Sequence, residues 1–271
     1  MTTELASTAP TSAYRLRADG AFESSALTRG PWDAAHQHAG PPIALIARSL
    51  LSVARGLGME HIARLSGSLW RPIPIDTLRI ETAIDYAGRN VAHLSARLLC
   101  EGRELARFTA VAQREVEIAL PDALERDPKP AAPLEPDSSP SVEFPYRTGV
   151  DGYHSLVELR TAKGTLCQGP CAIWFRLRRT LVEGEMPSAL ERVAVAADSG
   201  NGISAVLDFH RYSFVNSDLS VNLLRPARGE WVCLDAQTYI GPSGSGLSVA
   251  RIFDASGFIG RSAQSLLVRE R

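Results

Sequence analysis

The chain has 271 residues, of which 45% are hydrophobic and 22% are charged. This is the composition of an ordinary folded protein, and the length allows one large domain or two of about 130 residues. Acidic and basic residues nearly cancel to a formal net charge of -1, which excludes a global attraction to nucleic acid or to an anionic membrane.

The N-terminal segment has no basic stretch followed by an apolar one, so no signal peptide is predicted. The longest apolar stretch, GPPIALIARSLLSVARGLG, is interrupted by Arg48 and Arg55 and is too short to span a bilayer. We therefore expect a cytoplasmic protein that does not insert into a membrane.

The four cysteines are too few for a disulfide framework in a chain of this length. Cys167 and Cys171 lie four positions apart, and His36 and His38 lie two apart, but no further ligands nearby complete either pair. We expect buried or semi-buried thiols and histidines at the mouth of a pocket, with no metal and no cofactor.

The first half of the chain predicts one helix packed on an antiparallel sheet. Residues 1–12 are expected to form a disordered tail, and residues 13–24 a strand or hairpin around Gly20. A helix opens at Gly40 with two prolines in its first turn, and it is apolar nearly all round, as buried helices are. Residues 65–113 alternate between apolar and polar side chains, as strands do.

Residues 119–145 hold seven prolines and few large apolar residues, which predicts a linker. Beyond it, strands are predicted over 153–181, a helix over 186–198, and further strands from 219 to the C-terminus. The segment GPSGSGLS lacks the lysine of a phosphate-binding loop and lies between strands, so a hairpin loop is predicted there.

The two halves also align without a gap. The 40 residues from Arg71 to Ala110 and the 40 from Arg225 to Gln264 share five identical positions, including an Arg-Pro pair at the start of each. Duplication is the favoured interpretation, and two unrelated α+β domains are the alternative. The halves differ at Asp198, which ends the second helix and has no acidic counterpart at the first, so one half is expected to carry a site.

Several segments together resemble the acyl-CoA thioesterase II (TesB-like) family of the double hotdog thioesterase superfamily. They are HAGPPIALIARSL, SLWRPIP, AADSGNGIS, FVNSDLSVNLLRP and GFIGRSAQSLLVR, in that order. The resemblance implies an α+β double hotdog, in which two tandem repeats each wrap an antiparallel sheet around a long central helix. The expected units are a tail at 1–12, an N-terminal hotdog at 13–118, a Pro-rich linker at 119–145 and a C-terminal hotdog at 146–271 carrying the site.

In that family an aspartate, a threonine or serine, and a glutamine hold and activate a water. The resemblance assigns the aspartate to Asp198 and the glutamine to Gln264, whereas Asn216 stands at the hydroxyl position. Asparagine can donate to and accept from a water but cannot act as a base. A second interpretation of Asp198, as a capping or turn aspartate, stays open.

Small residues near the two helix ends are expected to contact the substrate, because glycine lets the backbone approach an acyl group closely. An asparagine among them has an alternative role, which is to hold a left-handed turn. The expected substrate-binding residues are Gly40, Gly200, Asn201 and Gly202.

The resemblance therefore implies an enzyme that hydrolyses a fatty acyl-CoA thioester to free acid and CoA, with surface arginines meeting the CoA phosphates. A non-catalytic acyl-CoA or lipid-binding hotdog protein is one alternative, and a hotdog hydratase or dehydratase is another. The segment VNSDLSVN lacks the histidine that such a hydratase motif requires. A homodimer or higher homo-oligomer is expected.

Overall fold

The computed structural model describes residues 10–121, 130–131, 133–145 and 150–271. Most of the expected tail, part of the expected linker and the start of the expected C-terminal unit therefore lie outside the described residues. The N-terminal half contains β1 (Ser12–Leu16), β2 (Phe22–Ser24), η1 (Ala26–Thr28), α1 (Gly40–Gly56), β3 (His61–Leu69), β4 (Thr77–Ala87), β5 (Val91–Cys100) and β6 (Arg103–Gln113).

The C-terminal half has a similar succession of strands and helices. It contains η2 (Pro136–Ser138), β7 (Ser141–Val142), α3 (Tyr153–Leu156), β8 (Val157–Lys163), β9 (Cys171–Leu177), β10 (Thr180–Val182), α4 (Ala189–Ala197), α5 (Gly200–Ile203), β11 (Tyr212–Asn216), β12 (Asp218–Leu223), β13 (Val232–Ile240), β14 (Ser245–Asp254) and β15 (Gly257–Glu270). The predicted second helix is therefore α4. Of the predicted hairpin loop at 241–248, residues 241–244 connect β13 and β14, whereas residues 245–248 already belong to β14.

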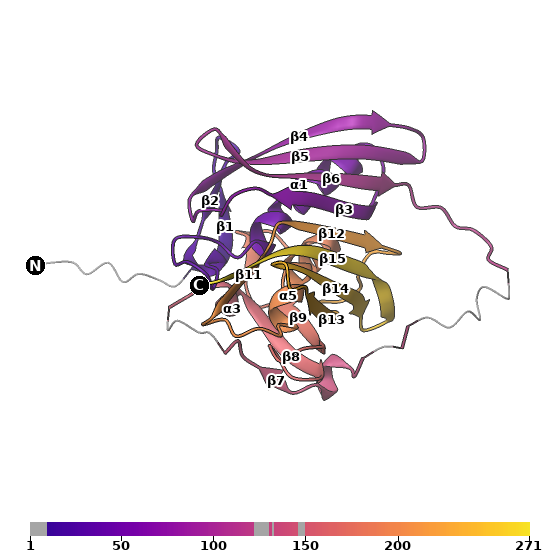
Figure 1. The fold of residues 1–271 in the computed structure, drawn as a ribbon. Coiled ribbons are helices and arrows are strands. Elements are labelled where there is room, and N and C mark those ends of the chain that lie inside the picture. The colour runs from indigo at the N-terminus through magenta and orange to yellow at the C-terminus, as the bar shows by residue number, and fades with distance from the viewer. Residues whose placement is uncertain (1–9, 122–129, 132, 146–149) are drawn as a thin grey trace, which may run out of the picture.

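Within the described residues the strands form one sheet, in the order β10-β1-β2-β4-β5-β6-β3-β12-β15-β14-β13-β9-β8-β7, and β11 pairs with β15 (Figure 1). The two halves join where β3 runs antiparallel to β12. On either side of this junction the strand order is mirrored, since β3-β6-β5-β4 corresponds to β12-β15-β14-β13.

The register of the two halves also agrees. A shift of 154 positions, the separation of Arg71 from Arg225, carries β5 onto β14 residue for residue. The same shift carries β6 onto β15 at its first residue and β4 onto β13 to within one residue at each end. The ungapped alignment of the sequence therefore aligns the strands themselves.

The residues at the ends of α1 and α4 explain why these two helices begin and end where they do. Two prolines occupy the first turn of α1, where their missing N–H groups cost nothing, and Arg55 lies in its last turn, where a cation favours the helix dipole. Helix α4 begins with a capping box, in which Ser188 and Glu191 each accept a hydrogen bond from the other's backbone N–H. The predicted burial of the first helix is confirmed, because α1 is buried along most of its length.

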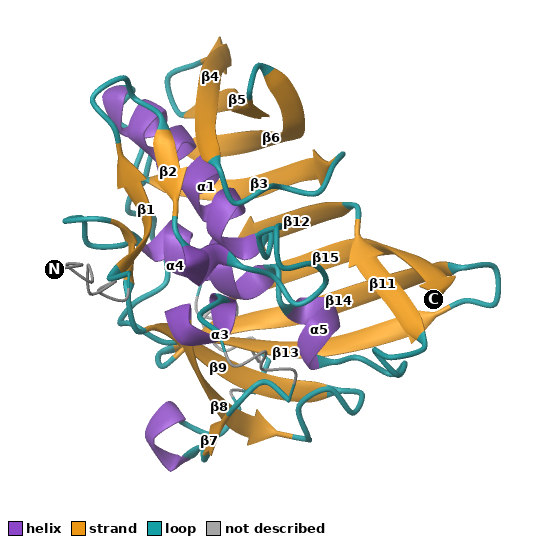
Figure 2. Cartoon of the chain, turned by 90° about the vertical axis from the view of Figure 1, so that its left-hand side faces the viewer, coloured by secondary structure: helices purple, strands orange, loops and turns teal. Residues whose placement is uncertain are grey.

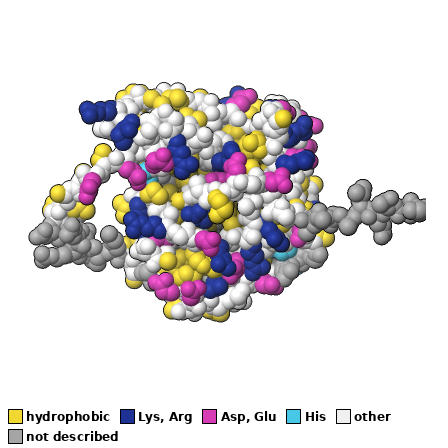
Figure 3. Space-filling view, turned by 180° about the vertical axis from the view of Figure 1, so that it is seen from behind, with side chains coloured by type: hydrophobic (Ala, Val, Ile, Leu, Met, Phe, Trp, Pro, Cys, Tyr) yellow, Lys and Arg dark blue, Asp and Glu magenta, His cyan; other side chains and the backbone are white. Residues whose placement is uncertain are grey.

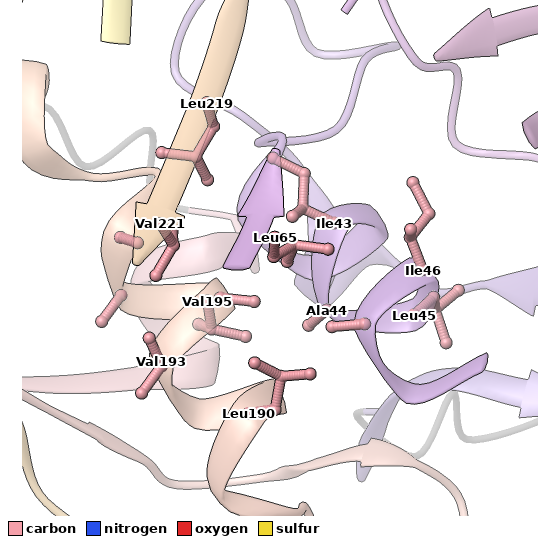
Figure 4. Close-up of a cluster of buried hydrophobic side chains, with 14 of the residues drawn as sticks. Ile43, Ala44, Leu45, Ile46, Leu65, Leu190, Val193, Val195, Leu219 and Val221 are labelled. Carbon is pink, nitrogen blue, oxygen red and sulfur yellow. The ribbon is translucent and has the colours of Figure 1, made fainter. Parts of the chain in front are cut away.

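The two helices pack against each other between the halves (Figure 2). In Figure 4, Ile43 and Ala44 of α1 lie near Val195 of α4, with Leu65 of β3 and Leu219 of β12 beside them. All five side chains belong to one continuous hydrophobic cluster that includes residues of both halves. The first turn of α1 is thereby fixed against the last turn of α4.

Part of the expected linker packs on the C-terminal half. The backbone carbonyl of Leu134 accepts a hydrogen bond of 2.7 Å from the indole of Trp174, and the carbonyl of Pro136 accepts one of 2.9 Å from Arg160. Strand β7 then pairs with β8. The proline content predicts an irregular chain here but does not reveal these contacts.

Charges of both signs are mixed on the surface. Figure 3 shows basic and acidic side chains interspersed over the face opposite to that in Figure 1, with hydrophobic ones between them. That face carries no extended region of one sign. In the part of the chain that the structure describes, no helix is both long enough and apolar enough to cross a membrane.

Gly40 is the closest point of the α1–α4 contact, because a Cβ atom there would lie 2.8 Å from the carbonyl oxygen of Val195. We expect Gly40→Ala to lower the free energy of unfolding by about 1–3 kcal/mol, the usual cost of overpacking. Gly56→Ala in the same helix is the matched control, since no atom lies within 4 Å of its added Cβ. Urea unfolding monitored by circular dichroism measures both, and equal stability of the two variants would contradict the close packing at Gly40.

Candidate active site

A cavity of about 710 Å³ lies where the two halves meet. Its walls come from residues 29–33 and 36–39 before α1, residues 69–73 at the end of β3 and just after it, Phe144, residues 152–154, the turn after α4 and strand β11. Most of this lining is apolar, and Asp198, Ser199 and Asn201 place polar groups at the end of α4. This is the usual make-up of a pocket for a small organic ligand, in which a few placed polar groups fix orientation.

The carboxylate of Asp198 lies in the wall of this cavity and is almost fully buried, with 3% of the residue exposed. One oxygen accepts a hydrogen bond of 2.8 Å from the side-chain amide of Asn216. The other lies 3.0 Å from Nδ1 of His38. A buried carboxylate requires such donors, because removing a charge from water without a partner is costly.

His38 comes from the other half of the chain and is held on two sides. Its backbone N–H donates to the carbonyl of Thr28 at 2.7 Å, and its ring stacks on Tyr153 with a centroid separation of 3.8 Å and an interplanar angle of 5°. The Tyr153 hydroxyl in turn donates to the carbonyl of Val195 at 2.9 Å. Burial raises the pKa of Tyr153 far above its ordinary value, so the hydroxyl keeps its proton as a donor.

Nδ1 of His38 has a second neighbour. The backbone nitrogen of Gly40 lies 3.1 Å away, in line for donation to Nδ1. A ring nitrogen is either a donor or an acceptor, so Nδ1 binds Asp198 when it carries a proton and Gly40 when it does not. An ionised Asp198 favours the Nδ1–H tautomer and leaves Nε2 as the free nitrogen.

The residue before His38 anchors this loop to the first strands. Gln37 is buried, and its amide oxygen accepts a hydrogen bond of 2.6 Å from the hydroxyl of Tyr14. Its amide nitrogen donates to Ser24 at 2.8 Å and to the carbonyl of Pro74 at 2.7 Å. The position of His38 is therefore set by three separate segments of the N-terminal half.

Gln264 meets the backbone of the Asp198 turn. Its side-chain nitrogen donates to the carbonyl of Asp198 at 3.0 Å, and its oxygen accepts from the backbone N–H of Asn201 at 3.1 Å. Gln264 is 2% exposed and is not part of the cavity lining. A Cβ atom on Gly200 would lie 3.0 Å from the same oxygen, so the glycine permits this close approach. Gln264 thus fixes the turn that carries Asp198.

The four residues expected to contact substrate occupy different positions. Asn201 and Gly202 line the cavity, whereas Gly40 and Gly200 lie behind its wall at the close contacts described above. A Cβ atom at Gly202 would meet nothing within 4 Å, so open space lies beside it. The alternative of a left-handed turn at Asn201 is wrong, because this residue lies in α5 and its amide donates to the carbonyl of Phe214.

His36 and His38 both line the cavity, as expected of pocket histidines, and their position at its mouth stays a prediction. No pattern in the sequence indicates that His38 meets Asp198, which is 160 positions away, since that contact depends on how α1 packs on α4. His36 pairs instead with Asp33, at 3.2 Å. Across the described residues, no group of three histidine, cysteine or acidic side chains could hold a metal ion.

One cysteine, Cys167, also lines the cavity. Burial raises the pKa of its thiol to about 11 and that of Cys171 to about 12. Near neutral pH both are therefore protonated and poorly nucleophilic. The expected buried or semi-buried state of the cysteines is confirmed, since Cys100, Cys171 and Cys233 are buried and Cys167 is half-buried.

Comparisons with known proteins agree with this architecture. The structure resembles a putative thioesterase II from Thermobifida fusca, with a TM-score of 0.74 and 19% identity over 92% of this chain and 91% of that one. A protein with a hot dog fold from Alicyclobacillus acidocaldarius gives 0.68 and 13% over 92% of each chain. An acyl-CoA thioesterase II, TesB2, from Mycobacterium marinum gives 0.63 and 17% over 93% of each chain. At such identities the likeness establishes the hotdog fold.

Sequence profiles of protein families identify the family, whereas the structural similarities above establish only the fold. The profile of the acyl-CoA thioesterase N-terminal domain matches residues 28–113, and that of the C-terminal domain matches residues 121–268. No curated protein matches the chain in a direct sequence search. Because the C-terminal profile alone spans more than half of the sequence, the chain belongs to the acyl-CoA thioesterase family.

Proposed function

We propose that this protein hydrolyses a fatty acyl-CoA thioester to free acid and CoA. The observation that carries the proposal is the carboxylate of Asp198, buried in the wall of an apolar cavity and held through both oxygens by His38 and Asn216. A carboxylate that is ionised, oriented and shielded from bulk water is suited to take a proton from a water beside a bound thioester.

The reaction begins when the oxygen of this water forms a bond to the thioester carbon while its proton passes to Asp198. The tetrahedral intermediate then collapses, the carbon–sulfur bond breaks, and the leaving CoA thiolate takes up the proton that Asp198 holds, which returns Asp198 to its carboxylate form. A carboxylate has lone pairs for about four hydrogen bonds, so two remain for the water after His38 and Asn216 have bound. Gln264 contributes by holding the backbone on which Asp198 sits.

Asn216 stands where the family resemblance implies a hydroxyl residue. Its amide nitrogen donates to Asp198, which is what a hydroxyl would also do. Because an amide nitrogen cannot accept a proton from water, Asn216 orients the carboxylate, and Asp198 is the only base of the pair.

We further propose that the two halves are tandem hotdog repeats, with boundaries at 13–118 and 146–271 and the linker at 119–145. The mirrored strand order, the common register and the separate matches of the two family profiles support the division into two repeats, and the C-terminal profile, which begins at residue 121, assigns most of the linker to the second repeat. A homodimer or higher homo-oligomer and a cytoplasmic location stay predictions. Light scattering of the purified protein measures the first.

A dehydratase is the second candidate, and the His38–Asp198 pair favours it. Histidine and aspartate side by side form an acid–base couple that could remove or add water at a carbon–carbon double bond. The family profiles favour hydrolysis. Loss of the enoyl absorbance of crotonyl-CoA would indicate the second activity, and tight acyl-CoA binding without any turnover would indicate the non-catalytic alternative.

The central variant is Asp198→Asn. We expect it to lower kcat for acyl-CoA hydrolysis by about 10²–10⁴-fold, the range that a positioned base contributes, with an unchanged circular dichroism spectrum. Asp137→Asn is the matched control, since that side chain is 95% exposed. Release of free CoA thiol, followed with a thiol-reactive dye, measures the rate. Full activity of a folded Asp198→Asn protein would remove Asp198 from the mechanism.

His38→Phe separates the two contacts of the imidazole, because phenylalanine keeps the stack on Tyr153 but cannot bind Asp198. We expect kcat to fall by about 10–100-fold, because a hydrogen bond to a charged group is worth about 1.5–3 kcal/mol. His36→Phe, in the same loop and also lining the cavity, should stay within about twofold of wild type. Equal effects of the two substitutions would show that His38 acts only as part of the wall.

A covalent mechanism would require a reactive thiol at Cys167, whereas attack by water does not use this side chain. With its pKa raised from 9.0 to about 11, the thiol has about a hundredfold less thiolate at pH 8 than an ordinary cysteine. We therefore expect iodoacetamide at pH 8 to modify Cys167 slowly, and the rate to rise as the pH approaches 11. Cys167→Ser should retain hydrolysis. Complete loss of hydrolysis in a folded Cys167→Ser variant would favour a covalent intermediate. Mass spectrometry of the modified peptide follows the reaction.

A further inference from the structure

A line of exposed apolar side chains crosses the outer face of the C-terminal sheet. It consists of Tyr239 on β13, Leu247 on β14, Leu267 on β15 and Val215 on β11, which are 51%, 45%, 46% and 36% exposed, and it is called the outer-sheet track below. Tyr239 pairs directly with Leu247, and Leu267 pairs directly with Val215. Leu247 and Leu267 are diagonal neighbours, since Leu247 pairs with Ser265.

The track begins at the cavity. Val215 and Leu267 belong both to the track and to the cavity lining that contains Asp198. Trp70 also lines the cavity and is 52% exposed, so the opening on this side has an aromatic edge. The cavity lining and the outer-sheet track therefore share two apolar side chains.

The cavity adjoins a second cleft of about 440 Å³, because Phe144 and His154 line both, and the wall of this cleft is mostly polar. This side of the cavity is called the polar end below. Two arginines, Arg178 and Arg179, contribute to that wall together with acidic side chains. A polar cleft suits the pantetheine and nucleotide parts of CoA, whereas an alkyl chain gains nothing there.

The track is narrow. Serines flank it, because Ser265 lies opposite Leu247 and Ser245 lies opposite Leu267. A stable protein–protein interface buries about 800 Å² on each partner, far more than one line of four side chains supplies. The width of the track and the two side chains that it shares with the cavity both fit a single flexible hydrocarbon chain.

We propose that the acyl group is a long chain whose distal methylenes leave the cavity past Val215 and Leu267 and lie along the outer-sheet track, while CoA occupies the polar end. This inference rests on the proposed function. From β11 to β13 the track crosses three strand spacings, about 14 Å in all. Each methylene removed from water is worth roughly a fourfold gain in affinity, so long chains should bind more tightly than short ones.

Leu247→Glu tests this proposal, because it places a charge in the middle of the track and away from the cavity lining. We expect KM for C14–C18 acyl-CoAs to rise by about tenfold, while KM for C4–C8 acyl-CoAs and kcat for all lengths stay unchanged. Ile84→Glu is the matched control, since Ile84 is an apolar strand residue of 50% exposure in the other half. It should change no parameter.

An equal effect of Leu247→Glu on short and long chains, or no effect on either, would overturn the proposal. A change of oligomeric mass in light scattering would do so too, since it would assign the track to a second copy of the chain. Calorimetric binding of the same acyl-CoAs gives a readout that does not require turnover. Absence of hydrolysis in the wild-type protein contradicts the proposed function, whereas length-independent binding contradicts the track alone.

Discussion

The burial of one negative charge at the end of α4 determines most of what surrounds it. Asp198 is the C-cap of that helix, where the helix dipole disfavours an anion, and only 3% of the residue reaches solvent. Two donors offset this cost, and they come from distant segments, His38 before α1 and Asn216 at the end of β11. The charge is therefore stable only when both halves of the chain are in place.

The contact between α1 and α4 makes this arrangement possible. Gly40 lets the first turn of α1 approach Val195 in the last turn of α4, and this brings His38 to Asp198. Tyr153 then ties the two together, since its ring stacks on His38 and its hydroxyl binds the carbonyl of Val195. The packing of the two helices, the hydrogen bonds to the buried carboxylate and the geometry of the site thus all depend on Gly40, His38 and Tyr153.

Much of the fold could be predicted because the sequence patterns that indicate its helices and strands are local. The apolar circumference of α1, the alternation in β4–β6 and the ungapped alignment of the two halves each depend on residues close in sequence or at a fixed spacing. The contact between His38 and Asp198 left no such signal, because it arises from helix packing across 160 positions. The family resemblance predicted Gln264 as a site residue, but only the structure shows its contacts, which are to the backbone of the Asp198 turn.

The central claim is that His38 and Asp198 work as one unit rather than as separate contributors. A double-mutant cycle on kcat with His38→Phe, Asp198→Asn and the combined variant tests this most directly, because groups that act together are not additive. If the two side chains act as one unit, the double variant is no slower than Asp198→Asn alone. Losses that multiply, so that the double variant shows the product of the two single effects, would contradict it.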